Sequence, residues 1–164
     1  MLGQVREALF NILGDQIVDA QVWDLFAGTG ANGIEALSRG ARRVVFVEKA
    51  NRALRILRDN LALLDEEDLD YEVVRGNAWD PLEDEDAPDI VFYDPPYTEV
   101  REDPTKSLAR AARVVNALSD GGRLVFHFPE GVLDEDDLAE LGDVDLRCWG
   151  GSAVALVRRE PLPH

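Results

Sequence analysis

Short apolar runs alternate with amphipathic stretches along this chain, and that alternation limits the possible folds more than any other feature of the sequence. The apolar runs have the length and composition of strands: residues 22–26, 43–47, 71–75, 89–93 and 123–128. Other stretches repeat apolar residues at helical spacing: residues 2–13, about 32–39, about 49–64, and a segment around 108–118. Strands that alternate with helices predict an α/β fold, with a mostly parallel sheet and helices on both faces.

Two further strands are predicted at residues 144–149 and 153–158, on either side of Gly150-Gly151. A glycine pair between two such runs is typical of a hairpin turn. We therefore expect seven strands, the last two forming an antiparallel hairpin. A length of 164 residues without a recognisable linker or repeat predicts a single domain over residues 1–164.

Composition indicates the cellular compartment of the protein. The longest apolar runs are far too short to cross a bilayer, and the first helix is amphipathic, unlike a secretion signal. The single cysteine, Cys148, allows no internal disulfide and fits a reducing cytoplasm. We expect a cytoplasmic protein with no membrane contact.

The net charge of −16 is unevenly distributed along the chain. Residues 1–64 carry eight Lys and Arg against seven Asp and Glu, whereas residues 65–164 carry nine against twenty-six. Acidic runs such as residues 134–137 are typical of solvated loops and helix starts. Basic residues gather on and just before one predicted helix: Arg39, Arg42, Arg43, Arg52, Arg55 and Arg58. They fit a solvated helix face, and they also offer the one region free of excess acid for contact with phosphate.

A glycine-rich loop joins the first predicted strand to the helix after it. Gly28, Gly30 and Gly33 have the spacing G-x-G-x-x-G, and small residues let a backbone approach a ligand closely. Glu48 ends the next strand, where a carboxylate can accept both hydroxyls of a ribose. Asn77-Ala78 follows the third strand, where an amide can meet an adenine edge. Together these residues predict a nucleotide-containing cofactor.

The residues Asp94-Pro95-Pro96-Tyr97 form the most distinctive turn. They follow an apolar run, at the carboxyl end of a predicted strand, where open α/β sheets bind ligands. Proline stiffens such a turn because its ring fixes φ. A stiff turn can hold Asp94 as an acceptor and Tyr97 as a stacking surface around a flat ring that carries an amine.

If the cofactor is S-adenosylmethionine, this turn suggests methyl transfer to an exocyclic amine of a base. The Asp94 carboxylate and the Pro95 carbonyl would accept the two N–H groups of an exocyclic base amine and direct its lone pair. Asp94 can then take a proton, and Tyr97 would stack on the ring. The scheme requires the cofactor pocket and the base pocket to open at the same rim of the sheet.

His127 interrupts the apolar run 126–128 of the fifth predicted strand. A metal site or a catalytic site needs partners, and the sequence holds no further cluster of His and Cys. We therefore interpret His127 as a core or sheet-edge histidine, and we expect no metal site.

These motifs resemble class I S-adenosylmethionine-dependent amino-methyltransferases, and more closely the RsmD-type family, which methylates the N2 amine of a guanine in small-subunit ribosomal RNA. The similar segments are residues 5–13, 24–30, 33–41, 94–97 and 149–153. The resemblance implies a Rossmann-like class I methyltransferase fold. It also implies ribosomal RNA or a small-subunit assembly particle as partner, and we expect a monomer.

The resemblance also implies site residues. Those on the cofactor side are Asp24, Phe26, Gly28, Gly30, Glu48, Asn77 and Ala78, and those that handle the guanine are Asp94, Pro95 and Tyr97. Arg6 would lie near the methionine end of the cofactor. Asn77 stands where aspartate is more usual. Family members also usually carry a basic segment before the first helix, where this sequence has Met1-Leu2-Gly3, and this difference leaves the capture of RNA an open question.

Other functions stay open from the sequence. The amine could belong to adenine N6 or cytosine N4, and the chain could be a nucleotide-binding relic without catalysis. A nicotinamide oxidoreductase also fits the glycine spacing, but Asp24 and the Asp94–Tyr97 turn argue against it.

Overall fold

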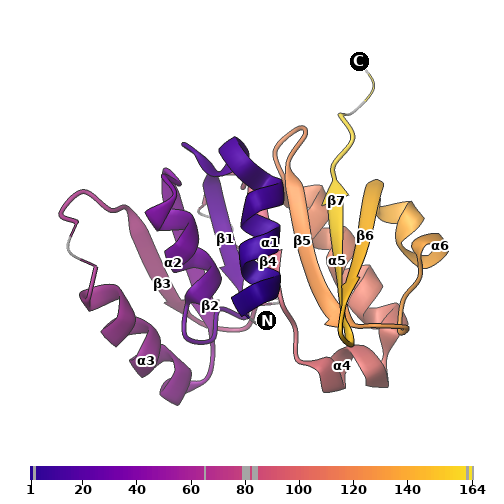
Figure 1. The fold of residues 1–164 in the computed structure, drawn as a ribbon, viewed down its shortest axis with the longest axis horizontal. Helices are drawn as coiled ribbons and strands as arrows, with labels where there is room; N and C mark the ends of the chain where they lie inside the picture. Colours follow the sequence, from indigo (N-terminus) through magenta and orange to yellow (C-terminus); the bar gives the residue numbers. More distant parts are fainter. Residues whose placement is uncertain (2, 65, 79–81, 83–84, 162, 164) are drawn as a thin grey trace. The chain divides into compact units, whose positions relative to one another are not determined.

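The computed structural model describes residues 1, 3–64, 66–78, 82, 85–161 and 163 (Figure 1). The chain divides into two compact units. One comprises Leu2–Asp86, and the other comprises Ala87–His164 together with Met1.

The Leu2–Asp86 unit is built on three parallel strands in the order β3-β2-β1. The strands are β1 (Gln21–Leu25), β2 (Arg43–Glu48) and β3 (Tyr71–Arg75). Its helices are α1 (Gly3–Leu13), the short 3-10 helix η1 (Gly14–Ile17), α2 (Ala31–Ser38) and α3 (Asn51–Ala62). The predicted cofactor residues lie on these strands, as Asp24 and Glu48 do, or in the segments that follow them, so this unit holds every residue predicted on the cofactor side.

Burial follows the apolar spacing that predicted these elements. Helix α1 buries Val5, Leu9, Phe10 and Leu13, which recur on one face. Helix α3 buries its leucines, Leu54, Leu57 and Leu61, in the same way. All of β1 is buried, as expected for a parallel strand covered on both faces.

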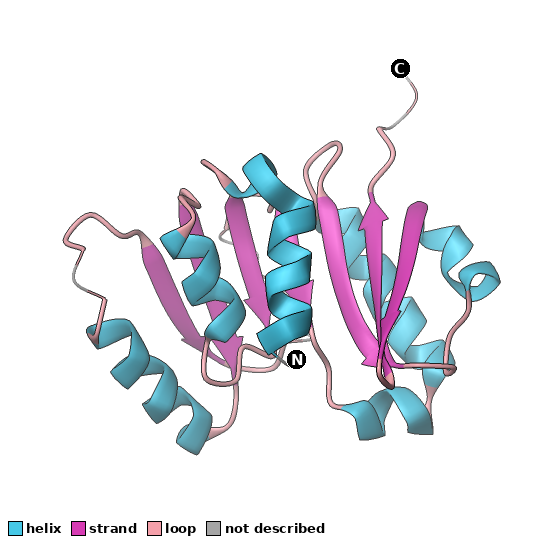
Figure 2. Cartoon of the chain, viewed as in Figure 1, coloured by secondary structure: helices cyan, strands magenta, loops and turns pink. Residues whose placement is uncertain are grey.

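The Ala87–His164 unit has four strands in the order β4-β5-β7-β6. Figure 2 shows strands in magenta and helices in cyan. They are β4 (Ile90–Tyr93), β5 (Arg123–Pro129), β6 (Asp143–Trp149) and β7 (Ser152–Arg158). Strands β4 and β5 are parallel, whereas β7 runs antiparallel to both β5 and β6. The helices are α4 (Tyr97–Glu102), α5 (Pro104–Ala117), α6 (Glu135–Leu138) and the 3-10 helix η2 (Ala139–Leu141).

The predicted fold class is confirmed: seven strands, mostly parallel, end in an antiparallel hairpin and alternate with helices. Helix α3 begins at Asn51, not near Lys49, because the Glu48 carboxylate takes the N–H groups of Lys49 and Ala50. The acidic run at residues 134–137 is a helix start, where Asp134 and Asp137 cap α6 reciprocally. Within the ranges described, no helix is long and apolar enough to cross a membrane.

Candidate functional site

The glycine loop leaves β1 through an unusual backbone. Phe26 has a φ of 58°, which is rare for a bulky residue and marks a chain held in place by its surroundings. Gly28 and Gly30 also have positive φ values, and Gly30 is the residue before α2. A β-carbon on Gly28 would meet no heavy atom within 4 Å, whereas one on Gly30 would overlap the Leu57 side chain. The loop is therefore packed tightly at Gly30 and open at Gly28.

Glu48 is oriented by peptide groups at the end of β2. Its Oε1 accepts the Gly28 N–H at 3.0 Å, and its Oε2 accepts the N–H groups of Lys49 and Ala50 at 2.7 and 2.8 Å. An ionised carboxylate has about four lone-pair sites. The remaining site lies on Oε1, so a ribose that left these bonds intact would be held by one hydroxyl at this oxygen.

Asp24 supports the loop from beneath. Its side chain is buried on β1, and Oδ2 accepts the Gly33 N–H of α2 at 2.9 Å. A charged acceptor aimed at the first turn of a helix is favourable, because backbone N–H groups there lack partners within the helix. This contact fixes the start of α2 relative to β1.

The carboxyl end of β3 lies beside the carboxyl end of β2. The N–H of Gly76 donates to the Glu48 carbonyl at 3.1 Å, directly before Asn77 and Ala78. Asn77 is exposed and Ala78 is buried. The loop after β1, Glu48 and the Asn77-Ala78 segment thus gather at the carboxyl ends of three adjacent parallel strands, as predicted for the cofactor side.

The turn after β4 lies in the other unit. Asp94 follows Tyr93, Pro95 is buried, and Pro96 directly precedes α4, whose first residue is Tyr97. The Asp94 side chain is 21% exposed, with Oδ2 3.6 Å from the amino nitrogen of Met1. Burial raises the pKa of Tyr93 far above its ordinary value, so this neighbouring phenol stays neutral.

A chain of hydrogen bonds joins this turn to two strands. Asp94 Oδ1 lies 2.7 Å from Nδ1 of His127, and Nε2 of His127 lies 2.9 Å from the Tyr97 hydroxyl. The Tyr97 hydroxyl also lies 2.8 Å from Oγ of Ser152, the first residue of β7. We call this series, Asp94, His127, Tyr97 and Ser152, the polar chain.

His127 is buried, at 3% exposure, as the sequence predicts, but its two partners were missed. The available signal was one polar residue inside the apolar run of the strand after β4. Strand register, which the sequence does not give, pairs Tyr93 with Phe126 and so brings the next residues, Asp94 and His127, to adjacent positions.

The Tyr97 ring is held on several sides. The Arg101 guanidinium lies over it, 5.5 Å from the ring centroid, and the His127 ring is tilted against it at 5.3 Å. A base that stacked on the face under Arg101 would have to displace this cation or sandwich with it. The stacking role of Tyr97 stays a prediction.

Ion pairs engage two arginines of the predicted basic cluster, whereas Arg42 is exposed before β2. Arg39 pairs with Glu35 at 2.7 Å. Arg43 pairs with Asp70, Glu72 and Glu85 at 2.6, 2.7 and 2.9 Å, and its hydrogen bond to Glu85 raises its pKa above the ordinary value. The exposed arginines of α3, which are Arg52, Arg55 and Arg58, we call the α3 arginine stripe.

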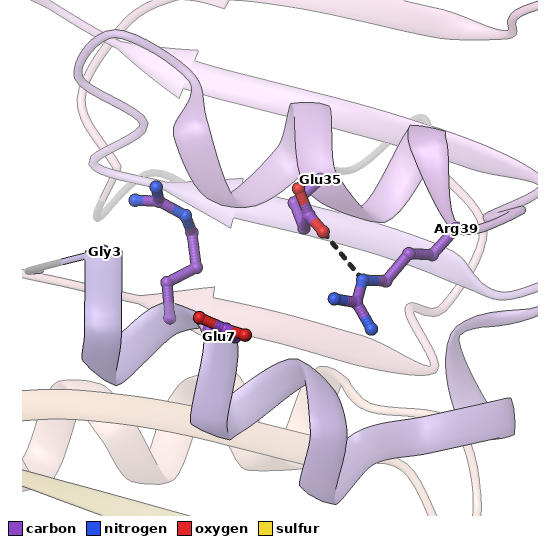
Figure 3. Close-up of a pocket in the computed structure, with 5 residues that line it drawn as sticks. Gly3, Glu7, Glu35 and Arg39 are labelled. Atoms are coloured by element: carbon purple, nitrogen blue, oxygen red, sulfur yellow. Dashed lines mark hydrogen bonds and ion pairs between the residues drawn. The ribbon is translucent and has the colours of Figure 1, made fainter.

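A polar hollow lies between α1 and α2 (Figure 3). It is lined by Gly3, Arg6, Glu7, Glu35 and Arg39, and the figure shows the ion pair of Glu35 with Arg39 facing the α1 residues. Equal numbers of acidic and basic side chains line it, so it attracts neither ion strongly. In the part of the chain that the structure describes, no three His, Cys, Asp or Glu residues are placed to hold a metal ion.

Comparison with known proteins gives one consistent result. A family model described as "Conserved hypothetical protein 95" matches residues 1–158. Ribosomal RNA small subunit methyltransferase D of Escherichia coli K12 is 45% identical over 95 residues, which cover 57% of this chain and 47% of that protein. The chain thus spans about half the length of the curated relatives that it first matches.

Solved structures agree with this match. A conserved hypothetical protein from Streptococcus pyogenes is 30% identical, with a TM-score of 0.78 over 94% of this chain and 95% of that one. An RNA methyltransferase from Salinibacter ruber in complex with S-adenosyl-L-homocysteine has a TM-score of 0.69 over 99% of this chain and 95% of that one. At 17% identity, the second likeness concerns the fold alone.

Proposed function

Since this chain belongs to the RsmD-type family, whose model is described as conserved hypothetical protein 95, we propose that it transfers a methyl group from S-adenosylmethionine to the N2 amine of a guanine in small-subunit ribosomal RNA. The observation that carries this proposal is the Asp94 carboxylate at the end of β4, with one oxygen anchored to His127 and the side chain still partly exposed. The work of such an enzyme would lie in the cytoplasm.

The residues present on the cofactor side fit S-adenosylmethionine. Gly28 has open space beside it, and Glu48 keeps one acceptor site on Oε1. Oδ1 of Asn32, at the start of α2, is buried and has no hydrogen-bond partner among the residues described, so it could accept from a bound amine. The residues that would hold the cofactor are Asp24, Phe26, Gly28, Gly30, Glu48, Asn77 and Ala78, with Asp24 acting through the loop. When bound, the cofactor supplies an electrophilic methyl group on a sulfonium.

The turn after β4 supplies hydrogen-bond acceptors that would make an exocyclic amine a better nucleophile. Such a nitrogen is a weak nucleophile, because its lone pair is delocalised into the ring. Hydrogen bonds from its N–H groups to Asp94 and to the Pro95 carbonyl would direct the lone pair and stabilise the charge that grows on nitrogen. The Asp94 carboxylate then accepts the proton that the nitrogen gives up.

Tyr97 would hold the base itself. A base stacked on an aromatic side chain gains about 1–3 kcal/mol. A guanine within structured RNA must first leave its own stack, which costs a few kcal/mol. The proposal requires the Gly28 loop and the Asp94 carboxylate to line one rim.

The direct test measures binding and transfer separately. We expect S-adenosylmethionine to bind in calorimetry, and nucleoside mass spectrometry to find N2-methylguanosine after incubation with small-subunit particles or their naked RNA. Methyladenosine or methylcytidine in its place would reassign the acceptor amine. Cofactor binding without transfer to any RNA would favour the nucleotide-binding relic, and binding of NAD alone would refute methyl transfer.

The α3 arginine stripe is the proposed contact for RNA phosphates. Its guanidinium groups stand three residues apart on an exposed face, and each phosphate contact adds about 0.7 to the dependence of log K on log salt for a single strand. Replacing Arg52, Arg55 and Arg58 by Gln should therefore make the salt slope of RNA binding shallower by about 2. Fluorescence anisotropy at several salt concentrations measures this slope.

A matched control separates this surface from general charge. Lys106 and Arg113 on α5 and Arg158 on β7 are also exposed. Replacing these three by Gln removes the same number of positive charges and should leave the salt slope within error of the parent protein. Equal slopes for the α3 arginine stripe variant and the parent would remove the stripe from the RNA contact.

A further inference from the structure

We propose that His127 is a positioning residue that holds the acceptor Asp94 and the ring of Tyr97 in one fixed relation. This inference rests on the proposed methyl transfer, and it assigns a role to a residue that the sequence alone marks only as core. Within the unit Ala87–His164, His127 is the member of the polar chain that contacts both Asp94 and Tyr97.

The direction of the hydrogen bonds follows from the donors and acceptors present. An ionised Asp94 can only accept, so Nδ1 of His127 must carry the proton at 2.7 Å. Nε2 of a neutral imidazole then accepts from the Tyr97 hydroxyl, and the Tyr97 oxygen accepts from Ser152.

Each end of the polar chain constrains a group that would touch the substrate. The bond from Nδ1 fixes the rotation of the Asp94 carboxylate, and an incoming N–H would take the place of the Met1 amino group, which lies 3.6 Å from Oδ2. The bonds at the Tyr97 hydroxyl anchor the far end of that ring to β5 and β7. Because His127 is buried on a paired strand, neither group can shift without breaking a hydrogen bond in a water-poor place.

Substitution of His127 by Asn or by Gln separates the contribution of the Nδ1 hydrogen bond from that of the Nε2 hydrogen bond. The amide nitrogen of Asn occupies nearly the position of Nδ1, whereas that of Gln reaches towards Nε2. We expect His127→Phe to lower kcat about 30-fold, with KM for RNA changed less than 3-fold, because orientation is lost while binding is kept. His127→Asn should recover most of the lost kcat by restoring the bond to Asp94, and His127→Gln should recover little.

Several outcomes would overturn the role. A His127→Phe protein that folds and keeps the parent kcat would do so. Rescue by Gln and not by Asn would mean that the contact with Asp94 is not the one that matters. Thermal melts of all three variants must accompany the kinetics, and His127→Asn controls for a loss caused only by unfolding.

A spectroscopic readout does not depend on activity. The chain has two histidines, so the signals that disappear in His127→Asn identify this ring. Nitrogen-15 NMR of the parent protein should show the Nδ1–H tautomer, with Nε2 unprotonated, near neutral pH. The opposite tautomer would refute the polar chain. If the parent methylates no RNA, the proposed function fails, whereas the NMR result still decides the hydrogen bonding.

Discussion

Replacing Asp94 by Ala is expected to lower turnover by about 100-fold or more, because it would remove the charged acceptor that we propose stabilises the transition state. Cofactor affinity should stay close to that of the parent protein, since the predicted cofactor residues end β1, β2 and β3 in the other unit. Single-turnover methyl transfer to small-subunit RNA, with calorimetry of cofactor binding beside it, measures both quantities.

The control lies at the other end of the same strand. Asp89 precedes β4 and its carboxylate accepts from Ser119 at 2.7 Å. Asp89→Ala removes a carboxylate of the same kind and should leave turnover within about 2-fold, at a stability cost of about 1.5–3 kcal/mol for the loss of a charged hydrogen-bond acceptor. An Asp94→Ala protein that turns over as fast as Asp89→Ala would remove Asp94 from the chemistry.

Replacing Gly33 by Ala is expected to destabilise the protein by about 3 kcal/mol, the upper end of the usual range for overpacked cores. A β-carbon at this position in α2 would overlap the ring of Phe46 and the side chain of Val44, both buried on β2. Either β2 residues or the helix must move, and a shift of α2 would also strain the bond from Gly33 to Asp24. Urea denaturation of the two proteins gives the difference in free energy of unfolding.

A second glycine supplies the comparison. Gly76 has room for a β-carbon, whose nearest heavy atom would be a Val74 methyl carbon at 3.9 Å. Gly76→Ala should therefore change the free energy of unfolding by less than about 0.5 kcal/mol. Similar losses in the two variants would show that close packing of α2 on β2 is not what Gly33 provides.

The strands and main helices were predictable because each repeats apolar residues at its own period. Helix α4 was not, since its six residues bury only Val100 and its limits are set by Pro96 and Asp103. Helix α6 was expected only as a helix start, because four residues show no period.

Some features of the candidate site were predictable from the sequence, and others were not. The positions of Glu48 and Asp94 at strand ends, on which their predicted roles depend, follow from the order of elements. The link through His127 does not, because it depends on how β4, β5 and β7 are aligned with one another. The three peptide N–H groups that occupy Glu48 were also beyond prediction, since they depend on the precise path of two loops. That the whole chain forms one domain stays a prediction.

The hold of peptide groups on Glu48 has a consequence for engineering. Side-chain substitutions that keep these peptide groups in place should leave the orientation of the Glu48 carboxylate unchanged, because the contacts that orient it within the described residues come from the backbone. Insertions or deletions in the segments after β1 and β2 would move these peptide groups and so change the orientation of the Glu48 carboxylate. Grafting a different cofactor preference onto this scaffold therefore calls for exchanging residues 21–51 as one block, with loop lengths preserved.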